Sequence, residues 1–356
     1  MTETAQSGPT DVDIFVSVGT DHHPFDRVLS WITTYSEQRR AAGKPVSVVV
    51  QSGTSEVALP DHIHANDLVP YETMVDLMKR AKIVVSHGGP ATIMDARDLG
   101  NRPIVVPRDP ELGEHVDGHQ QRFARFLGAR DQVTLAEEYD TFTASLDAAL
   151  ADPQLVSVAS DSAQVDEAVR EVGRLVDRAV YLGERPGKAK LPLRFRRRPN
   201  SELAPDQYRV LFATSHGGHL AQCLRLAPWT DDHERRWVTF DTLSVRSSLE
   251  GEQVKWAYYP TTRNVWNLIR NTWLGLRFLQ KERIDVVVST GAGVAVPFFW
   301  LSRLFGAVTV YIEVYDRIDS ATMTGKLVKK ASDLFLVQWP EQLEVYPDAT
   351  LVGKLL

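Results

Sequence analysis

The 356-residue chain has one cysteine, no long apolar run and little excess of either charge. Cys223 by itself excludes an intrachain disulfide and a cysteine-built metal site, and it fits a reducing compartment. The polar residues 1–10 lack the apolar core of a signal peptide. The longest uncharged run, 286–302, is shorter than a membrane span, and its glycines and proline favour a strand, a turn and a helix. The net charge of −6 argues against a nucleic-acid-binding protein.

The length is sufficient for two domains, and a change in composition shows where they meet. Residues 183–199 are rich in Pro, Gly and Arg, which is typical of a domain boundary. On both sides of it, short β-branched stretches alternate with amphipathic ones, which predicts parallel sheets with crossover helices. We therefore predict an α/β fold with a first domain at 1–158, a helical and basic linker at 159–205 and a second domain at 206–356.

A glycine turn between a strand and a helix is the central motif of the first domain. Residues 82–85 read as a short buried strand, His87-Gly88-Gly89 breaks it, and Pro90 suits the first position of a helix. Backbone N–H groups at such a helix start bind phosphate, and glycines let the phosphate approach. Thr92 and Asp95 share a face of this helix, where they offer a hydroxyl to phosphate and a carboxylate to ribose. One Gly-Gly alone would favour an ordinary turn.

A second His-Gly-Gly, His216-Gly217-Gly218, follows a predicted strand in the other half. Two such turns in separate domains favour a shared phosphate-handling cleft over coincidence. His219 comes next, at a helix start, where the positive end of the dipole keeps an imidazole neutral and suits it to act as a base. Glu313, at the end of a predicted strand, is the alternative base, and an ion pair with Arg317 is its structural interpretation.

Residues 113–120 are dense in hydrogen-bonding side chains and follow a predicted strand, where open parallel sheets bind ligands. Contacts with sugar hydroxyls rank first for these side chains, and a hydrated helix start ranks second. Metal ligation by His115 and His119 ranks third, with His22-His23 elsewhere in the domain, because clusters of His and carboxylate bind zinc. The candidate sugar contacts are Glu114, His115, Asp117, His119 and Gln120.

A predicted amphipathic helix at 263–281 carries arginines seven residues apart beside two tryptophans. This pattern is typical of a helix lying at a membrane surface, and core packing with a solvated arginine edge explains it equally well. The basic linker favours the membrane, since each basic residue near an anionic surface contributes about 1 kcal/mol. The predicted membrane contacts are Arg196, Arg197, Arg198, Trp266, Arg270, Trp273 and Arg277.

These motifs resemble two partner subunits of known glycosyltransferases. The first half, with Ile14-Phe-Val-Ser-Val-Gly-Thr20, Ser86-His-Gly-Gly-Pro90 and Gly113-Glu-His-Val-Asp117, resembles one subunit of the split bacterial exopolysaccharide glycosyltransferases. That subunit is similar to the catalytic partner of the eukaryotic two-subunit N-acetylglucosaminyltransferase of dolichol-linked oligosaccharide assembly. The second half, with Val288-Ser-Thr-Gly-Ala-Gly293 and Tyr311-Ile-Glu313, resembles the membrane-recruiting subunit.

The resemblance implies a GT-B fold, two Rossmann-like domains facing a cleft, with the donor half first and thus in reversed order relative to single-chain members. It implies a UDP-sugar donor, a polyprenyl-diphosphate-linked saccharide acceptor and inversion without a metal, so no cofactor is expected. The implied donor-side residues are Gly19, Thr20, Leu68, Val69, His87, Gly88, Gly89, Thr92, Asp95, His119 and Gln120. We add Glu114 and His115 to the donor side from the polar segment 113–120, and we assign the acceptor side to His216, Gly217, Gly218, Gly291, Gly293 and Arg317.

We accordingly predict an inverting glycosyltransferase of bacterial exopolysaccharide or capsule synthesis, cytoplasmic and peripheral on the inner membrane face. Its base is His219 or Glu313. One alternative is a UDP-sugar epimerase of the same fold, which would convert its donor with no acceptor present. A second alternative is a non-catalytic scaffold that recruits another transferase to the membrane, and it would not bind UDP.

Overall fold

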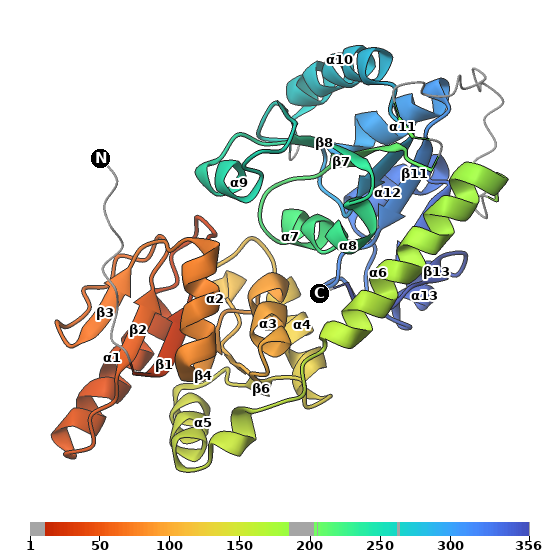
Figure 1. Cartoon of the computed structure of the whole chain (residues 1–356). Coiled ribbons are helices and arrows are strands. Elements are labelled where there is room, and N and C mark those ends of the chain that lie inside the picture. Colours follow the sequence, from red (N-terminus) through yellow and green to blue (C-terminus); the bar gives the residue numbers. More distant parts are fainter. Residues whose placement is uncertain (1–10, 185–202, 205, 262–263, 356) are drawn as a thin grey trace. The chain divides into compact units, whose positions relative to one another are not determined.

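The chain divides into two units, 1–162 and 163–356, and each has a parallel sheet of its own (Figure 1). Among the described residues, no helix has the length and apolarity that a membrane span requires. The computed structural model describes residues 11–184, 203–204, 206–261 and 264–355.

The six strands of the first unit are β1 (Val12–Ser17), β2 (Val48–Gln51), β3 (Ile63–Asn66), β4 (Ala81–Ser86), β5 (Ile104–Val105) and β6 (Thr134–Leu135). All pairs are parallel, in the order β3-β2-β1-β4-β5-β6. The chain builds one side of the sheet outward from β1 and then returns to build the other side from β4. The boundary between β1 and β4 is therefore a topological switch point, where open α/β sheets bind ligands beyond the carboxyl ends of the strands.

The helices of the first unit are α1 (Asp26–Ala41), α2 (Tyr71–Arg80), α3 (Pro90–Asp98), α4 (His119–Gly128) and α5 (Tyr139–Ala151). Alternate residues of a strand point to opposite faces, so the apolar run of β1 supplies two cores. Ile14 and Val16 pack with α1 and α5, while Phe15 packs with α2 and α3. The sheet is thus covered on both faces, as the alternating sequence pattern predicted.

The seven strands of the second unit are β7 (Arg209–Ala213), β8 (Glu234–Thr239), β9 (Val254–Trp256), β10 (Val286–Ser289), β11 (Val308–Ile312), β12 (Leu334–Val337) and β13 (Thr350–Leu351). All pairs are parallel, in the order β13-β12-β11-β10-β7-β8-β9. The switch point lies between β7 and β10, as it lies between β1 and β4 in the first unit.

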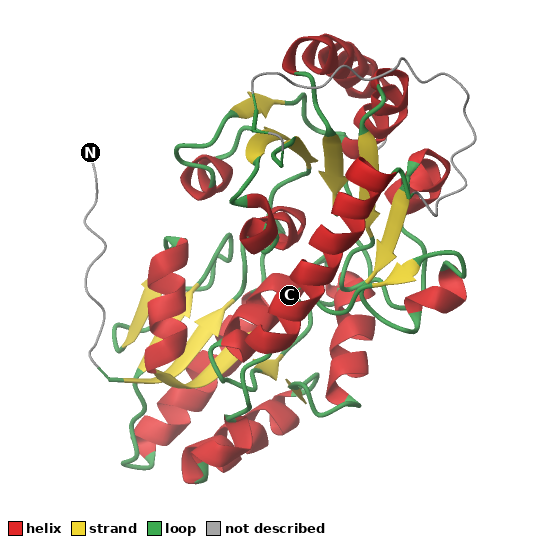
Figure 2. Ribbon diagram, turned by 45° about the vertical axis from the view of Figure 1, so that its right-hand side comes forward, coloured by secondary structure: helices red, strands yellow, loops and turns green. Residues whose placement is uncertain are grey.

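The helices of the second unit are α6 (Ser162–Asp177), α7 (Gly218–Leu224), α8 (Ala227–Thr230), α9 (Leu243–Ser248), α10 (Val265–Glu282), α11 (Ala295–Phe305), α12 (Met323–Val328) and α13 (Gln342–Val345). One core contains apolar residues of α6 and α7, and the core on the opposite face contains those of α10 and α11. Figure 2 shows the strands of both units enclosed by helices. The uncharged run 286–302 is β10, a glycine turn and most of α11, as predicted from its composition.

The predicted linker at 159–205 needs a correction, because its helical part belongs to the second unit. Val165, Val169, Val172 and Val176 of α6 are buried in the core that also contains β7 and β10. Their spacing puts them on one helix face, and that apolar face is buried against the second sheet. The predicted membrane contacts Arg196, Arg197 and Arg198 lie outside the described residues.

Candidate functional site

Glycine turns follow both central strands of the first unit. Gly19 comes two residues after β1, and His87-Gly88-Gly89 follows β4 directly. Ser17 and Ser86 are register partners at the ends of these strands, and the N–H of His87 donates to the carbonyl of Ser17 at 3.2 Å. The topology therefore places the two turns side by side at the switch point.

The His87 ring fills the space between the two turns. A Cβ on Gly19 would lie 2.5 Å from the ring, and a Cβ on Gly89 would lie 2.2 Å from its Nε2. Gly19 also has a φ of +80°, which side-chain-bearing residues rarely adopt. Burial, with a smaller contribution from the Arg108 guanidinium, lowers the pKa of His87 to about 3. His87 is therefore a neutral ring that both glycines accommodate.

The N-terminus of α3 offers backbone N–H groups beside this ring. Gly89 is the N-cap residue, Pro90 is the first helical residue, and the first turn carries no acidic residue. No side chain among the described residues caps these N–H groups, which is the condition for binding an anion there. Thr92 and Asp95, predicted to lie near phosphate and ribose, are both buried on α3.

Tyr71, at the start of α2, joins this group, although no sequence motif marks it as a site residue. Its hydroxyl donates to a carboxylate oxygen of Asp95 at 3.1 Å. Leu68 and Val69 lie just before α2, and Leu68 is 63% exposed, which leaves an apolar side chain open to a partner such as a base ring. Thr20 is exposed in the turn after β1.

Glu114 is accounted for by structural contacts rather than by sugar hydroxyls. Its carboxylate is buried and accepts from the Arg27 guanidinium at 3.0 and 2.8 Å. It also accepts from the backbone N–H of Asp109 at 2.7 Å. This correction follows from geometry: both carboxylate oxygens already have charged or backbone donors, and a buried carboxylate needs them.

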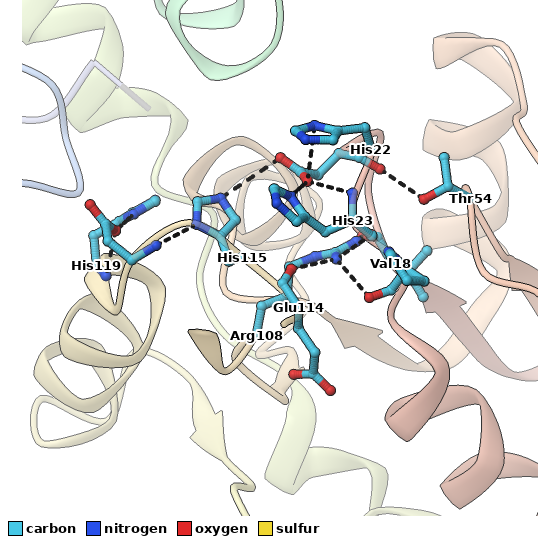
Figure 3. A network of polar contacts seen from close by, with 11 residues as sticks. Val18, His22, His23, Thr54, Arg108, Glu114, His115 and His119 are labelled. Atoms are coloured by element: carbon cyan, nitrogen blue, oxygen red, sulfur yellow. Dashed lines mark hydrogen bonds and ion pairs between the residues drawn. The ribbon is translucent and has the colours of Figure 1, made fainter. Parts of the chain in front are cut away.

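Arg108 holds the neighbouring loops together, and sequence reasoning did not select it (Figure 3). Its buried guanidinium donates to the carbonyls of Val18 at 2.8 Å, His23 at 2.7 Å and Glu114 at 3.0 Å. One side chain thus ties the turn after β1 to the segment that leads into α4. Burial lowers the pKa of Arg108, but an arginine remains charged in spite of such a shift.

The start of α4 brings two predicted sugar contacts toward the glycine turn. A Cβ on Gly88 would lie 2.8 Å from the Cβ of Gln120, so these residues touch. Gln120 is buried, and its Oε1 has no hydrogen-bond partner among the described residues. His119, the first residue of α4, is only partly buried. Its backbone N–H donates to Asp117 Oδ1 at 3.0 Å.

A histidine and a glycine turn also meet at the switch point of the second unit. A Cβ on Gly291, which has a φ of +133°, would lie 2.6 Å from the His219 ring. His219 Nδ1 lies 3.0 Å from the carbonyl oxygen of Thr290. A carbonyl oxygen only accepts, so Nδ1 carries a proton, and Nε2 is the atom that can act as a base in the neutral form of the ring. This tautomer suits a general base.

The other acceptor-side residues lie around this turn or apart from it. His216 is exposed, with its ring 6.1 Å from the rings of Phe240 and Tyr259. Gly217 is the N-cap of α7, at a φ of +69°, and Gly218 begins that helix. Gly293 packs against Thr261, where a Cβ would lie 3.1 Å from the threonine. Arg317 is partly buried, and its carbonyl accepts from Gln342 at 3.1 Å.

Glu313 does not reach a ligand surface, which corrects its prediction as a base. It is 0% exposed and accepts from the hydroxyls of Tyr346 at 2.5 Å and Tyr311 at 3.3 Å. Thr322 and the Val314 N–H donate to it as well. Burial raises the pKa of this carboxyl. Since Thr322 is the N-cap of α12, Glu313 fastens that helix to β11, and His219 is left as the candidate base.

Helix α10 exposes the tryptophans that the sequence singled out. Trp266 is 76% exposed and Trp273 is 60% exposed, while Asn267, Asn271 and Leu279 form the buried face. Core packing therefore does not explain the two tryptophans. Arg270 and Arg277 are exposed, and the Arg270 guanidinium lies 3.8 Å from the centre of the Tyr258 ring. A groove of about 640 Å³ runs along this face, with arginine, lysine and aromatic side chains in its lining.

Comparisons with known proteins agree with this division of the chain. Residues 13–168 match the family described as Glycosyltransferase family 28 C-terminal domain, and residues 253–355 match Oligosaccharide biosynthesis protein Alg14 like. Human UDP-N-acetylglucosamine transferase subunit ALG14 is 25% identical over 182 residues, which cover 42% of this chain and 84% of that protein. The mouse protein of the same name is 27% identical over 190 residues, covering 44% and 88%.

Two solved glycosyltransferase structures are also similar. MurG of Acinetobacter baumannii is 16% identical, with a TM-score of 0.32 over 37% of this chain and 42% of that chain. The glycotransferase of kitacinnamycin is 17% identical, with a TM-score of 0.28 over 44% and 40%. These scores are too low to add to the argument.

The protein is a glycosyltransferase, and its two doubly wound units are domains of the GT-B type. In a single polypeptide it joins a family 28 C-terminal domain, in the first unit, to an Alg14-like domain in the second. This arrangement confirms the resemblance to a fused form of the two-subunit enzymes.

Proposed function

We propose that this glycosyltransferase moves a sugar from a UDP-sugar to a polyprenyl-diphosphate-linked saccharide, with inversion and without a metal. The observation that carries the proposal is the uncapped α3 N-terminus at the switch point of a family 28 domain. UDP-N-acetylglucosamine is the first donor to test, since the ALG14 relatives are named for its transfer. We place the reaction in bacterial exopolysaccharide or capsule synthesis.

Donor binding is assigned to the first unit. The diphosphate would accept from the backbone N–H groups of Gly89, Ala91 and Thr92, with the Thr92 hydroxyl beside it. The ribose would meet Asp95, which Tyr71 holds in place. The uracil would lie at Leu68 and Val69. His119 and Gln120 would contact the sugar, and the unpartnered Oε1 of Gln120 is an acceptor ready for a sugar hydroxyl.

Catalysis is assigned to His219 of the second unit. A base removes the proton of an acceptor hydroxyl, whose oxygen attacks the anomeric carbon while the bond to UDP breaks on the opposite face. One such displacement inverts the configuration. The α3 dipole and its N–H groups would stabilise the charge that develops on UDP, which is the work a metal does in other transferases. Exhaustive chelation should therefore leave turnover undiminished.

The acceptor lipid implies a membrane surface, and we propose that α10 contacts it on the inner face of the cytoplasmic membrane. Exposed Val265, Trp266, Ile269 and Trp273 give the helix an apolar face. Arg270 and Arg277 on the same helix would meet anionic headgroups. Peripheral attachment of this kind needs no membrane-spanning helix.

Release of UDP from UDP-N-acetylglucosamine, in the presence of a polyprenyl-diphosphate-linked saccharide, tests the enzymatic proposal. His219→Ala should lower turnover by roughly 10²–10⁴-fold while UDP affinity by calorimetry stays unchanged. His64→Ala is the control, because His64 is an exposed histidine of β3 with no assigned role in the reaction. Full turnover in His219→Ala would refute the assignment of the base. Donor conversion without an acceptor would show an epimerase, and absence of UDP binding would show a scaffold.

Sedimentation with anionic vesicles tests the membrane proposal separately. Binding should fall as salt rises, because the Debye length shortens from about 30 Å at 0.01 M to about 10 Å at 0.1 M. Trp266→Ala and Trp273→Ala should each weaken binding by roughly 1–3 kcal/mol. Leu243→Ala, on the equally exposed α9, is the control and should bind as the wild type does. No binding at low salt would contradict the proposal.

A further inference from the structure

Two groups of histidine and aspartate adjoin in the first unit, and the proposed reaction uses only part of one. Asp21-His22-His23 follows the turn after β1, and His115, Asp117 and His119 lead into α4. Within each group, one ligand atom per residue lies within 4.8 Å of the others. The groups meet where His115 Nε2 lies 3.7 Å from Asp21 Oδ2. Figure 3 shows His115 between His23 and His119.

The two nitrogens of His115 have different surroundings. The Asp117 N–H donates to Nδ1 at 3.5 Å, so Nδ1 carries the lone pair. Nε2 lies 3.7 Å from Asp21 Oδ2, which is longer than a hydrogen bond but close enough for a small side-chain movement to make one. In carboxylate–histidine–metal triads, one ring N–H donates to a carboxylate while the other ring nitrogen binds the metal. Asp21 is thus placed to orient His115.

Asp117 and His119 complete a set of three ligands on a five-residue segment. The rings of His115 and His119 are 4.7 Å apart in a T-shaped pair, and Asp117 bonds to the His119 ring. The side chain of Asp117 is 42% exposed, so an ion from solvent can reach it. Zinc–nitrogen and zinc–oxygen bonds of about 2.0–2.1 Å place tetrahedral ligands about 3.3 Å apart, which small rotations of these side chains supply.

The donor set selects the kind of ion. Imidazole nitrogens with a carboxylate suit zinc, whereas magnesium prefers oxygen ligands. The carboxylates of Asp21 and Asp117 together balance a divalent charge. Three protein ligands leave one position open, which is typical of an exchangeable ion rather than of a closed structural site.

We propose that His115, Asp117 and His119 bind a zinc ion, with Asp21 orienting His115, and that the bound ion inhibits sugar transfer. Inhibition rests on the proposed function, which assigns His119 to the donor sugar: a His119 ring that ligates zinc is withdrawn from that contact. The binding of zinc does not rest on it. The ion is a regulator here, and the chemical step proceeds without it.

Cobalt(II), a spectroscopic probe for zinc sites, tests the binding on the full chain. Visible absorption should show one bound equivalent that zinc displaces. Asp117→Asn and His115→Ala should each remove the signal, and Asp21→Asn should weaken affinity by roughly 10–100-fold. His64→Ala, an exposed histidine of β3, should bind as the wild type does. Absence of a stoichiometric signal, or an unchanged signal in His115→Ala and Asp117→Asn, would overturn the site.

UDP release at increasing free zinc tests the inhibition. Wild-type turnover should fall as the site fills, and Asp117→Asn should keep its own turnover across the same range. Equal inhibition of both proteins, or a wild type indifferent to zinc that saturates the site, would overturn the inhibitory role. The cobalt titration needs no substrate, so an incorrect donor or acceptor would leave its result standing.

Discussion

The two switch points use the same parts in opposite order. In the first unit the histidine comes from the turn after β4 and packs against Gly19, which follows β1. In the second unit the histidine follows β7, the strand equivalent to β1, and packs against Gly291, which follows β10. A ring against a glycine turn is therefore common to both units, although the strands that supply them are exchanged.

The His-Gly-Gly tripeptides themselves have different roles. His87 is buried between two glycines, and Gly89 caps a nine-residue helix. His216 is exposed, and it is His219, outside the tripeptide, that packs against the opposite turn. The two identical tripeptides thus place different histidines at the switch points. In the first unit the tripeptide leads into the nine-residue helix α3, whose N-terminus is the proposed phosphate site, whereas α7 in the second unit has seven residues.

The largest effect expected from this difference is that of adding one methyl group at Gly89. Gly89→Ala puts a Cβ 2.2 Å from His87 Nε2, so the ring or α3 must move. Overpacking costs roughly 1–3 kcal/mol. Because the displaced ring and helix start form the proposed phosphate site, we expect UDP affinity to fall roughly 10–100-fold. Calorimetry with UDP measures this.

Gly217→Ala is the matched substitution in the second tripeptide. Nothing lies within 4 Å of its added Cβ, and only the φ of +69° opposes the change. It should cost roughly 1–2 kcal/mol of stability and leave UDP affinity unchanged. Equal losses of UDP affinity in the two variants would show that the tripeptides act alike.

Glu313→Gln tests whether His219 is the base that the second unit supplies and Glu313 is a structural residue. The amide keeps the shape but replaces a carboxylate that accepts from Tyr311, Thr322 and Tyr346. We expect a loss of roughly 1–3 kcal/mol in unfolding free energy, with turnover per folded molecule retained. Urea unfolding and UDP release check the two parts. A fall in turnover with normal stability would restore Glu313 as a base.

The smallest effect expected is a pH dependence of stability that the buried ring of His87 causes. The pKa of His87 is lowered to about 3 in the folded chain, whereas an exposed histidine of the unfolded chain has a pKa of 6.5. Between these values the unfolded chain binds more protons, so stability falls as the pH drops below about 6.5, by up to about 1.4 kcal/mol per unit. Urea midpoints at pH 7 and pH 5.5 should differ less in His87→Gln. An unchanged midpoint difference in His87→Gln would exclude the buried ring as the cause.

Much of the fold was predictable because its signals are local. Apolar and β-branched residues predicted β4 and β10, and an amphipathic pattern with arginines seven residues apart predicted α10. Strand β3 was missed because only Ile63 of its four residues is buried, so no apolar alternation marks it. Helix α6 was recognised as a helix but left in the linker, because an apolar stripe does not say which sheet covers it.

The sequence by itself determined the two α/β units, the glycine turns after the strands and the Trp–Arg helix, because these depend on neighbours in the chain. The tertiary structure decided that the two tryptophans of this helix are exposed and which polar residues are available to a ligand. The Glu114 carboxylate is hydrogen-bonded by Arg27, and the Glu313 carboxylate is hydrogen-bonded by the hydroxyls around β11. Gln120 Oε1, by contrast, has no hydrogen-bond partner among the described residues. Whether a polar side chain is available depends on partners far away in the sequence, as the Arg27–Glu114 pair shows with its separation of 87 residues. A local sequence pattern does not indicate such partners.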